Sequence, residues 1–161
     1  MLSEHSMKVS IQEFVEEDRE LCKQVLDELS SWFGIKSSNE AYISILGTIP
    51  TAVAVVDDEI IGFAAIEQHN KDSIELHVIA VKKAYHDRGI GTKLINWAES
   101  WCRVKGVSWF HVETRGPSTP DPGYEKTRKF YEAKEFVPLF ESLSIWGPEN
   151  AALVMVKKLT E

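Results

Sequence analysis

The sequence lacks the features of membrane-inserted and secreted proteins. It contains no run of 18 apolar residues, so no membrane-spanning helix and no membrane partner are expected. The first ten residues, MLSEHSMKVS, include no apolar stretch of the kind found in secretion signals, and residues 1–6 are expected to form a loose tail.

Cysteine and basic residues are also scarce. The two cysteines, Cys22 and Cys102, lie in helical patterns without metal-ligand spacing, so we expect buried free thiols, a cytoplasmic location and no metal. The 25 acidic residues outnumber the 18 basic ones, and the net charge of −7 argues against a nucleic-acid partner. No repeat, low-complexity tract or linker interrupts the 161 residues, which predicts a single domain over residues 1–161.

The most informative segment is residues 74–95, IELHVIAVKKAYHDRGIGTKLI. Its first eight residues are mostly apolar and rich in β-branched side chains, as in a buried strand, and from Ile90 the apolar residues follow helical spacing. Gly89 and Gly91 lie at the junction, where four basic residues accompany one acidic residue. Because the first turn of a helix has unpaired N–H groups and a positive dipole end, this junction predicts an anion site.

The remaining patterns predict an α+β protein with a mixed sheet. Three successive strands joined by short turns indicate an antiparallel meander, and Gly62 inside the second of them indicates a bulge or a close backbone approach. A right-handed crossover would place the strand after the glycine-led helix parallel to residues 74–81. Strands are predicted at 8–14, 51–56, 60–68, 74–81, 107–114, 136–145 and 151–158, and helices at about 16–33, 39–46, 88–105 and 124–133.

This order of elements resembles the GNAT superfamily of N-acetyltransferases over nearly the whole chain. The family's signature is Gln or Arg, two residues, Gly, one residue, then Gly or Ala, and it falls on residues 86–91 with His86 in the first position. The resemblance implies a GNAT-like acyl-CoA N-acyltransferase fold: a mostly antiparallel twisted sheet with one central parallel strand pair and about four helices.

The resemblance also implies how acetyl-CoA would bind. Its pyrophosphate would lie on the loop amides, and its pantetheine arm would pair with the backbone of the preceding strand. The family's Asn-x-x-Ala-x-x-x-Tyr segment falls on residues 124–131, with Tyr and Thr replacing the Asn and Ala. The implied cofactor-binding residues are Ile79, Ala80, Val81, His86, Asp87, Arg88, Gly89, Ile90, Gly91, Thr92, Tyr124 and Thr127.

Acetyl transfer to an amine requires a base for the ammonium proton and an acid for the leaving thiolate. Tyr131 occupies the family's acid position, although a tyrosine with helical spacing also packs in cores. Glu75 lies eleven residues before His86, the spacing of the catalytic Glu in several family members, and a solvent-facing strand residue is the alternative. His77 shares its strand face and is a rival or a partner. Weaker candidates are Glu67 and Glu113, and His111, which has no partner visible in sequence.

We therefore predict an N-acetyltransferase that moves an acetyl group from acetyl-CoA to a primary amine of a small molecule or peptide by direct attack in a ternary complex. The alternative is a non-catalytic acyl-CoA-binding regulatory domain. A nucleotide-binding domain is disfavoured because the G-x-x-x-x-G-K-S/T motif is absent. Dimers are common among similar proteins, so the resemblance is compatible with a homodimer.

Overall fold

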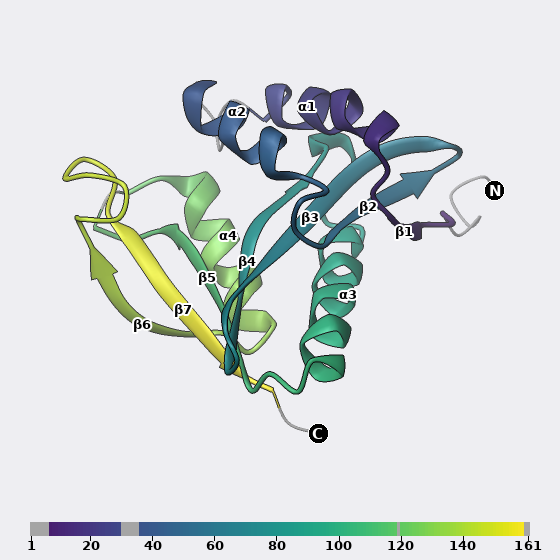
Figure 1. The fold of residues 1–161 in the computed structure, drawn as a ribbon. Helices are drawn as coiled ribbons and strands as arrows, with labels where there is room; N and C mark the ends of the chain where they lie inside the picture. Colours follow the sequence, from purple (N-terminus) through teal and green to yellow (C-terminus); the bar gives the residue numbers. More distant parts are fainter. Residues whose placement is uncertain (1–6, 30–35, 119, 160–161) are drawn as a thin grey trace. The chain divides into compact units, whose positions relative to one another are not determined.

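The computed structural model describes residues 7–29, 36–118 and 120–159. Within these ranges the chain forms four α-helices and seven strands (Figure 1). In chain order they are β1 (Ser10–Glu13), α1 (Arg19–Asp27), α2 (Lys36–Ile45), β2 (Thr51–Val56), β3 (Glu59–Asn70), β4 (Ser73–Val81), α3 (Ile90–Val104), β5 (Trp109–Arg115), α4 (Pro122–Ala133), β6 (Val137–Ser142) and β7 (Ala152–Lys158). Short 3-10 helices precede α1 and α3, at Glu16–Asp18 and Lys83–Tyr85. No helix of the described ranges is long and apolar enough to cross a membrane.

The described strands form one mixed sheet in the order β1-β2-β3-β4-β5-β7-β6. β4 and β5 run parallel, with Ser73–Leu76 facing Trp109–Val112. The pairs β1–β2, β2–β3, β5–β7 and β7–β6 are antiparallel. This topology confirms the predicted α+β class, with its single parallel pair and four helices.

Several boundaries differ from the sequence prediction, and one of these differences concerns His69. The sequence suggests a turn from His69 to Asp72, but β3 continues to Asn70. The Asn70 side-chain oxygen accepts hydrogen bonds from the N–H groups of Asp72 and Ser73, at 2.8 and 3.0 Å, which confines the turn to two residues. The strand predicted at residues 136–145 also ends earlier than expected, at Ser142. The first helix, predicted to reach about residue 33, ends earlier, at Asp27, and is followed by a turn at residues 28–29. Trp32 and Phe33 lie outside the described residues.

The chain divides into two compact units, and β3, β4 and α3 contribute residues to both. Unit 1 comprises residues 1–65 and 78–97, and unit 2 comprises residues 66–77 and 98–161. The prediction of a single domain over 1–161 stays a prediction.

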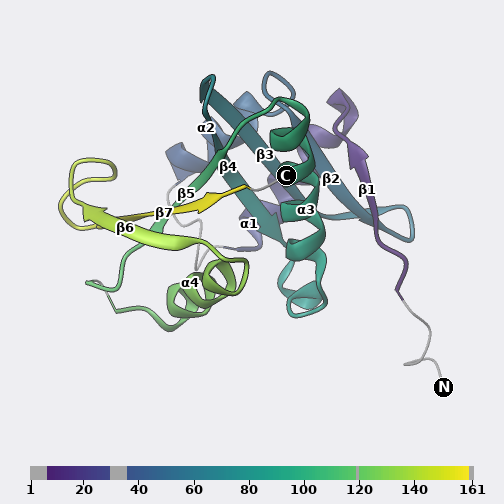
Figure 2. The same cartoon turned by 90° about the horizontal axis from the view of Figure 1, so that it is seen from below.

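In unit 1, helices cover both faces of the strands. Figure 2 shows α1 and α2 on one face of β2 and β3 and the start of α3 on the other. The apolar side of α1 packs into a fully buried core, in which Cys22 is one of the helix residues and Phe63 comes from β3. Burial raises the pKa of the Cys22 thiol to about 12, so the residue behaves as a small apolar side chain.

In unit 2, α4 packs against the strands through an aromatic group. The ring of Phe136 lies 5.3 Å from that of Phe110 on β5 and 5.6 Å from that of Tyr131 on α4. On the C-terminal half of α3, the buried Glu99 pairs with Lys157 of β7 at 2.7 Å. Cys102 is buried and free, as expected, and burial raises the pKa of its thiol to about 12.

Gly62 confirms the close approach predicted inside its strand. A Cβ atom at this position would lie 2.9 Å from the backbone oxygen of Ala80 on β4, closer than a carbon atom packs against an oxygen. On the other side of β3, the register with β2 shifts directly after the Ala54–Gly62 pair. Gly62 therefore lets β3 and β4 approach each other within unit 1.

We expect Gly62→Ala to lower the free energy of unfolding by about 1–3 kcal/mol, because the added methyl group has to displace backbone rather than a side-chain tip. Urea unfolding followed by circular dichroism measures this change. A free energy of unfolding equal to that of the wild type would show that the two strands have room for a side chain here.

Candidate active site

The loop after β4 is held in one shape by side chains of unit 1. His86 donates a hydrogen bond from Nε2 to the carbonyl oxygen of Val81 at 2.7 Å, and its own N–H bonds to the carbonyl oxygen of Lys83. The Arg88 guanidinium lies 5.7 Å from the centre of the Tyr85 ring. His86, whose place in the signature departs from the usual Gln or Arg, thus joins its loop to the end of β4.

The backbone of this loop leads into the open start of a helix. Asp87 and Gly89 both have left-handed backbone angles, with φ of 62° and 79°. The backbone N–H of Lys93 donates the first main-chain hydrogen bond of α3, to the carbonyl oxygen of Gly89 at 3.1 Å. The N–H groups of Ile90, Gly91 and Thr92 precede this bond, so they form the open first turn of a 15-residue helix. An alternation of left-handed residues before a helix start is the backbone arrangement that binds anions.

Lys82, one of the four basic residues near the loop, pairs with acidic residues outside the loop. Lys82 lies 3.8 Å from a carboxylate oxygen of Glu28 and 3.7 Å from one of Glu59. Its side chain therefore links the residue that follows α1 to β3 within unit 1, and the local positive charge at the loop comes from the basic residues that follow Lys82.

Residues 79–81 complete the predicted cofactor residues of unit 1. The parallel ladder with β5 ends at Leu76, and β4 continues beyond it to Val81. The Ala80 side chain is buried, whereas those of Ile79 and Val81 are half-buried. The Val81 carbonyl oxygen is bonded to His86.

In unit 2, α4 carries the other predicted residues on its less exposed side. Asp121 caps the helix by accepting hydrogen bonds from the N–H groups of Gly123 and Tyr124. The Tyr124 ring lies under the guanidinium of Arg115, and the Thr127 hydroxyl donates to the Gly123 carbonyl oxygen at 3.1 Å. Tyr131 is 4% exposed and packs against Phe130 and Phe136, so it has the packing environment of a core residue as well as the position of the proposed acid.

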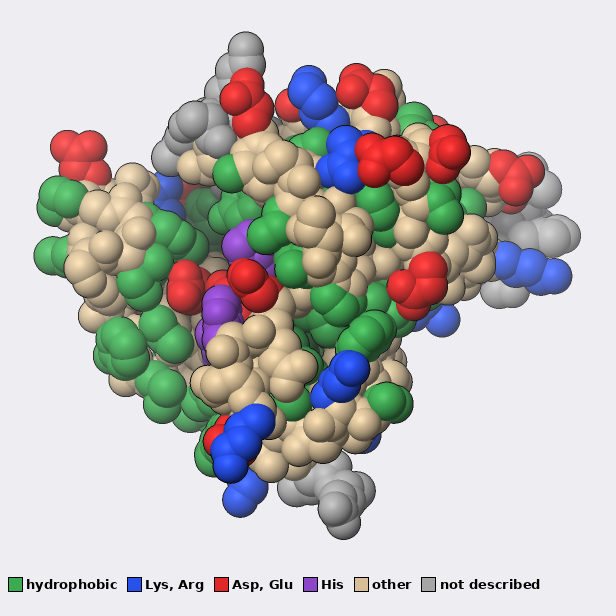
Figure 3. Space-filling view, viewed as in Figure 1, with side chains coloured by type: hydrophobic (Ala, Val, Ile, Leu, Met, Phe, Trp, Pro, Cys, Tyr) green, Lys and Arg blue, Asp and Glu red, His purple; other side chains and the backbone are tan. Residues whose placement is uncertain are grey.

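A group of carboxylates and imidazoles lies on adjacent strands of unit 2, and we call it the Glu–His cluster. Each of β3, β4 and β5 contributes one Glu and one His, two residues apart and therefore on the same side of the strand. Red and purple side chains meet at this surface in Figure 3. The members are Glu67, His69, Glu75, His77, His111 and Glu113.

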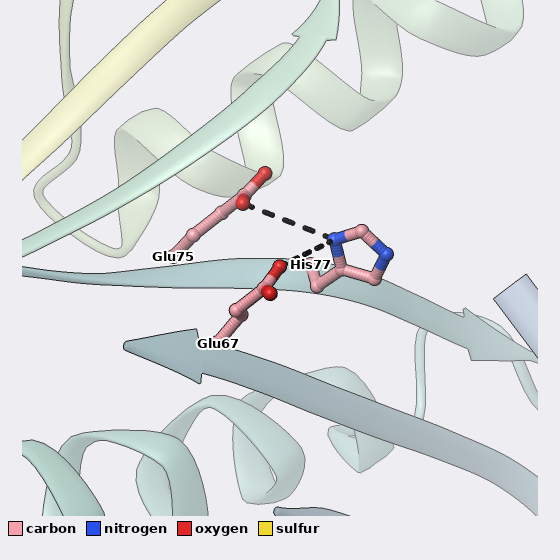
Figure 4. A group of neighbouring side chains, drawn as sticks. All are labelled: Glu67, Glu75 and His77. Carbon is pink, nitrogen blue, oxygen red and sulfur yellow. Dashed lines mark ion pairs between the residues drawn. The ribbon is translucent and has the colours of Figure 1, made fainter. Parts of the chain in front are cut away.

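Glu75 is at the centre of the Glu–His cluster. Its Oε1 atom lies 2.7 Å from Nε2 of His69 and 3.8 Å from Nδ1 of His77. The same His77 nitrogen lies 3.8 Å from Oε1 of Glu67 (Figure 4). His111 is opposite Glu75 in the parallel register, and its ring centre lies 5.9 Å from that of His69.

These contacts give the members of the cluster different protonation states. Burial raises the pKa of Glu75, but the neighbouring His77 and His69 lower it more, so it lies below its usual value. Glu75 raises the pKa of His77 in turn, against the effect of burial. Burial lowers the pKa of His111, and burial together with the charge of Glu75 raises that of Glu113. At neutral pH the cluster thus combines an ionised carboxylate with a neutral imidazole, His111, that can accept a proton.

The structure brings together most of the residues considered for proton transfer. Glu75, His77, Glu67, Glu113 and His111 all belong to the cluster. His69 was missed, because the sequence places it in a turn. The signal that could have found it is the repeated Glu-x-His or His-x-Glu spacing, which occurs on all three strands.

Comparison with known proteins identifies the family. Residues 48–138, which are 91 of the 161 residues, match the model of the acetyltransferase (GNAT) domain. The chain belongs to the GNAT acetyltransferase family. No curated protein sequence matches it significantly.

Solved structures of GNAT proteins share the fold at low sequence identity. Ard1 from Thermoplasma volcanium has a TM-score of 0.79 and 17% identity, with 95% of this chain and 99% of that chain covered. PaiA N-acetyltransferase from Thermoplasma acidophilum, solved in complex with coenzyme A, has a TM-score of 0.75 and 18% identity, with coverages of 95% and 100%. The aminoglycoside 6'-N-acetyltransferase from Enterococcus faecium has a TM-score of 0.74 and 20% identity, with coverages of 94% and 98%. At these identities the likeness establishes the fold.

Proposed function

We propose that this GNAT protein transfers the acetyl group of acetyl-CoA to a primary amine of a small molecule or peptide, by direct attack of the amine in a ternary complex. The observation that carries the proposal is the Glu–His cluster, a half-buried set of proton acceptors on a GNAT sheet. An alkylammonium ion has to lose a proton before its nitrogen can attack a thioester, and such a cluster can remove it.

The backbone of unit 1 fits acetyl-CoA as cosubstrate. The open first turn of α3 and the left-handed residues before it suit a pyrophosphate, which accepts hydrogen bonds from backbone N–H groups. The part of β4 beyond the parallel ladder, residues 79–81, suits the amides of a pantetheine arm, which can bond to a strand edge. These features support the assignment of residues 79–81 and 86–92 to acetyl-CoA. The assignment of Tyr124 and Thr127 as further contact residues rests on the family resemblance.

We assign the proton transfers to two residues. Glu75, directly or through a water, takes the proton of the ammonium, and the neighbouring His69 and His77 hold its carboxylate in place. As the tetrahedral intermediate collapses, the C–S bond breaks and the Tyr131 hydroxyl gives its proton to the CoA thiolate. The carboxylates of the Glu–His cluster also favour amine substrates that carry a positive charge.

The direct test measures release of free CoA thiol from acetyl-CoA in the presence of single amines: polyamines, aminoglycosides, amino acids, peptide N-termini and lysine side chains. We expect release above the hydrolysis background with at least one amine, and an acetylated product by mass spectrometry. Tight binding of CoA without release for any amine would overturn the proposal and favour a non-catalytic acyl-CoA-binding regulatory domain.

Replacing Tyr131 with Phe is expected to lower kcat about 100-fold and to change the KM for acetyl-CoA little, because a proton donor is lost while the ring keeps its packing against Phe130 and Phe136. Steady-state kinetics with the best amine of the panel measures both constants. An unchanged kcat would make Tyr131 a packing residue only. Thermal unfolding of the variant serves as the control for the fold.

We also expect two copies of the chain to associate through β6. Within the part of the chain that the structure describes, this strand pairs with β7 alone and forms one end of the sheet order, and Val137, Leu139 and Phe140 on it are 55–59% exposed. Hydrophobic side chains gather over β6 in Figure 3. An exposed apolar edge strand can pair with the same strand of a second copy about a two-fold axis.

Light scattering coupled to size exclusion tests this association. The wild type is expected to elute as a dimer, and Phe140→Glu, which places a like charge on each copy, as a monomer. A monomeric wild type at high micromolar concentration would contradict the proposed dimer.

A further inference from the structure

Three side chains of the Glu–His cluster are arranged like the ligands of a metal ion. One ligand atom each from Glu67, Glu75 and His77 can be chosen so that all three lie within 4.8 Å of one another. Figure 4 shows both carboxylates pointing at the His77 ring, one from β3 and one from β4. The three side chains are 13–34% exposed, so an ion could reach them while remaining partly shielded from water.

We propose that Glu67, Glu75 and His77 bind a zinc-like divalent transition-metal ion, and that this ion inhibits the enzyme. The ligand set of one imidazole nitrogen and two carboxylate oxygens is typical of Zn²⁺ and its neighbours in the first transition row rather than of Mg²⁺ or Ca²⁺, which prefer oxygen alone.

The distances are close to those of a preformed site. Nδ1 of His77 lies 3.8 Å from a carboxylate oxygen of Glu67 and 3.8 Å from one of Glu75. With the third separation below 4.8 Å, a point equidistant from the three atoms lies at most about 2.5 Å from each, against 2.0–2.2 Å in zinc sites. A movement of a few tenths of an ångström along each side chain would close this gap.

The surroundings of the three ligands favour a cation further. His69 lies 2.7 Å from Glu75 Oε1, so it can orient that carboxylate in the way that partners of ligands do in metal sites. His111 and Glu113 on β5 add a second imidazole and a third carboxylate to the same cluster. A divalent ion here would offset the negative charge of the cluster, and a fourth position would stay open for water or for another imidazole.

Binding of the metal ion does not depend on the proposed acetyl transfer, whereas its inhibitory effect rests on that function. If Glu75 is the base, a metal ion on its carboxylate would block the proton transfer, and inhibition by zinc would follow. If the protein does not acetylate amines, the ion still binds, because its ligands are present in either case.

Isothermal titration of the chelator-treated full chain with ZnCl₂, without acetyl-CoA, tests the binding. We expect one ion per chain, bound with micromolar or tighter affinity, and at least about 10-fold weaker binding in His77→Gln and in Glu67→Gln. The matched control is His86→Gln, which removes an imidazole from unit 1 and should leave the zinc affinity unchanged. Co²⁺ in place of Zn²⁺ should give the visible absorption of a four- or five-coordinate site, and this absorption should be lost in His77→Gln.

The outcomes separate the two proposals. Absence of zinc binding at 100-fold molar excess, or affinity undiminished in both ligand variants, would overturn the metal site and leave the acetyltransferase proposal intact. If either variant fails to fold, a rise in the Tm of the wild type with zinc concentration, together with the Co²⁺ spectrum, decides instead. Failure of the amine panel in chelating buffer would overturn the acetyltransferase proposal and leave the metal site intact.

Discussion

Gly89→Asp is expected to lose measurable binding of acetyl-CoA while keeping the fold. The fold survives because a Cβ atom at Gly89 meets nothing within 4 Å and aspartate tolerates the left-handed conformation better than most residues. Binding is lost because the new carboxylate would bond to the open first turn of α3 and repel the pyrophosphate. Removing two charge-assisted hydrogen bonds costs about 3–6 kcal/mol, which corresponds to a Kd roughly 10²–10⁴-fold higher.

The control for this variant lies at the far end of the same helix. Gly106 follows α3, has a φ of 71°, and its added Cβ would also meet nothing within 4 Å. Gly106→Asp therefore introduces the same charge and a similar backbone strain away from the loop. Calorimetric titration with acetyl-CoA should show normal affinity for Gly106→Asp and none for Gly89→Asp. Normal affinity in both would refute the assignment of residues 86–92 to the pyrophosphate.

Glu75→Gln is expected to lower kcat on the order of 10³-fold near neutral pH, because the variant keeps the size of the side chain and loses the proton acceptor. The deficit should shrink as the pH rises towards the pKa of the acceptor amine, because the amine is then already deprotonated and needs no base. A pH profile of kcat with one amine, for wild type and variant, measures this convergence.

The neighbouring carboxylate provides the comparison for Glu75. Glu67→Gln makes the same change on β3, where the side chain is more exposed, 34% against 13%, and we expect a loss of less than about tenfold. Equal losses at all pH values in both variants would point to a structural effect on the cluster. An unaffected kcat in Glu75→Gln would exclude it as the base and leave the neutral His111 as the candidate.

The fold was predictable where a single local signal determined the structure. Thr51–Val56 is an uninterrupted β-branched and alanine run, and β2 covers the same residues. The position of Gly62 inside a strand predicted the close approach of the β4 backbone that the structure has. The end of β3 was not predictable in this way, because the side chain of Asn70 moves the turn by two residues, and this depends on a hydrogen bond rather than on residue preference.

The site was predictable only in part, for a physical reason. The loop after β4 is contiguous in sequence, so its two glycines and the start of α3 could be recognised together. The Glu–His cluster joins three strands whose register the sequence does not state, and so His111 had no visible partner and Glu67 no visible relation to His77. The sequence did not predict the candidate metal site for the same reason, because Glu75 and His77 lie on β4 and Glu67 on β3.

The hydrogen bond between His86 and Val81 affects the thermodynamics of ligand binding. It closes a ring of six residues at the end of β4, so the loop loses its conformational freedom when the protein folds rather than when a ligand arrives. If the loop binds a pyrophosphate, as we propose, the ligand would meet amides that are already in position, and its association should carry a small unfavourable entropy and a fast on-rate. In this chain His86, which replaces the usual Gln or Arg of the family signature, fixes the conformation of the loop before any ligand binds.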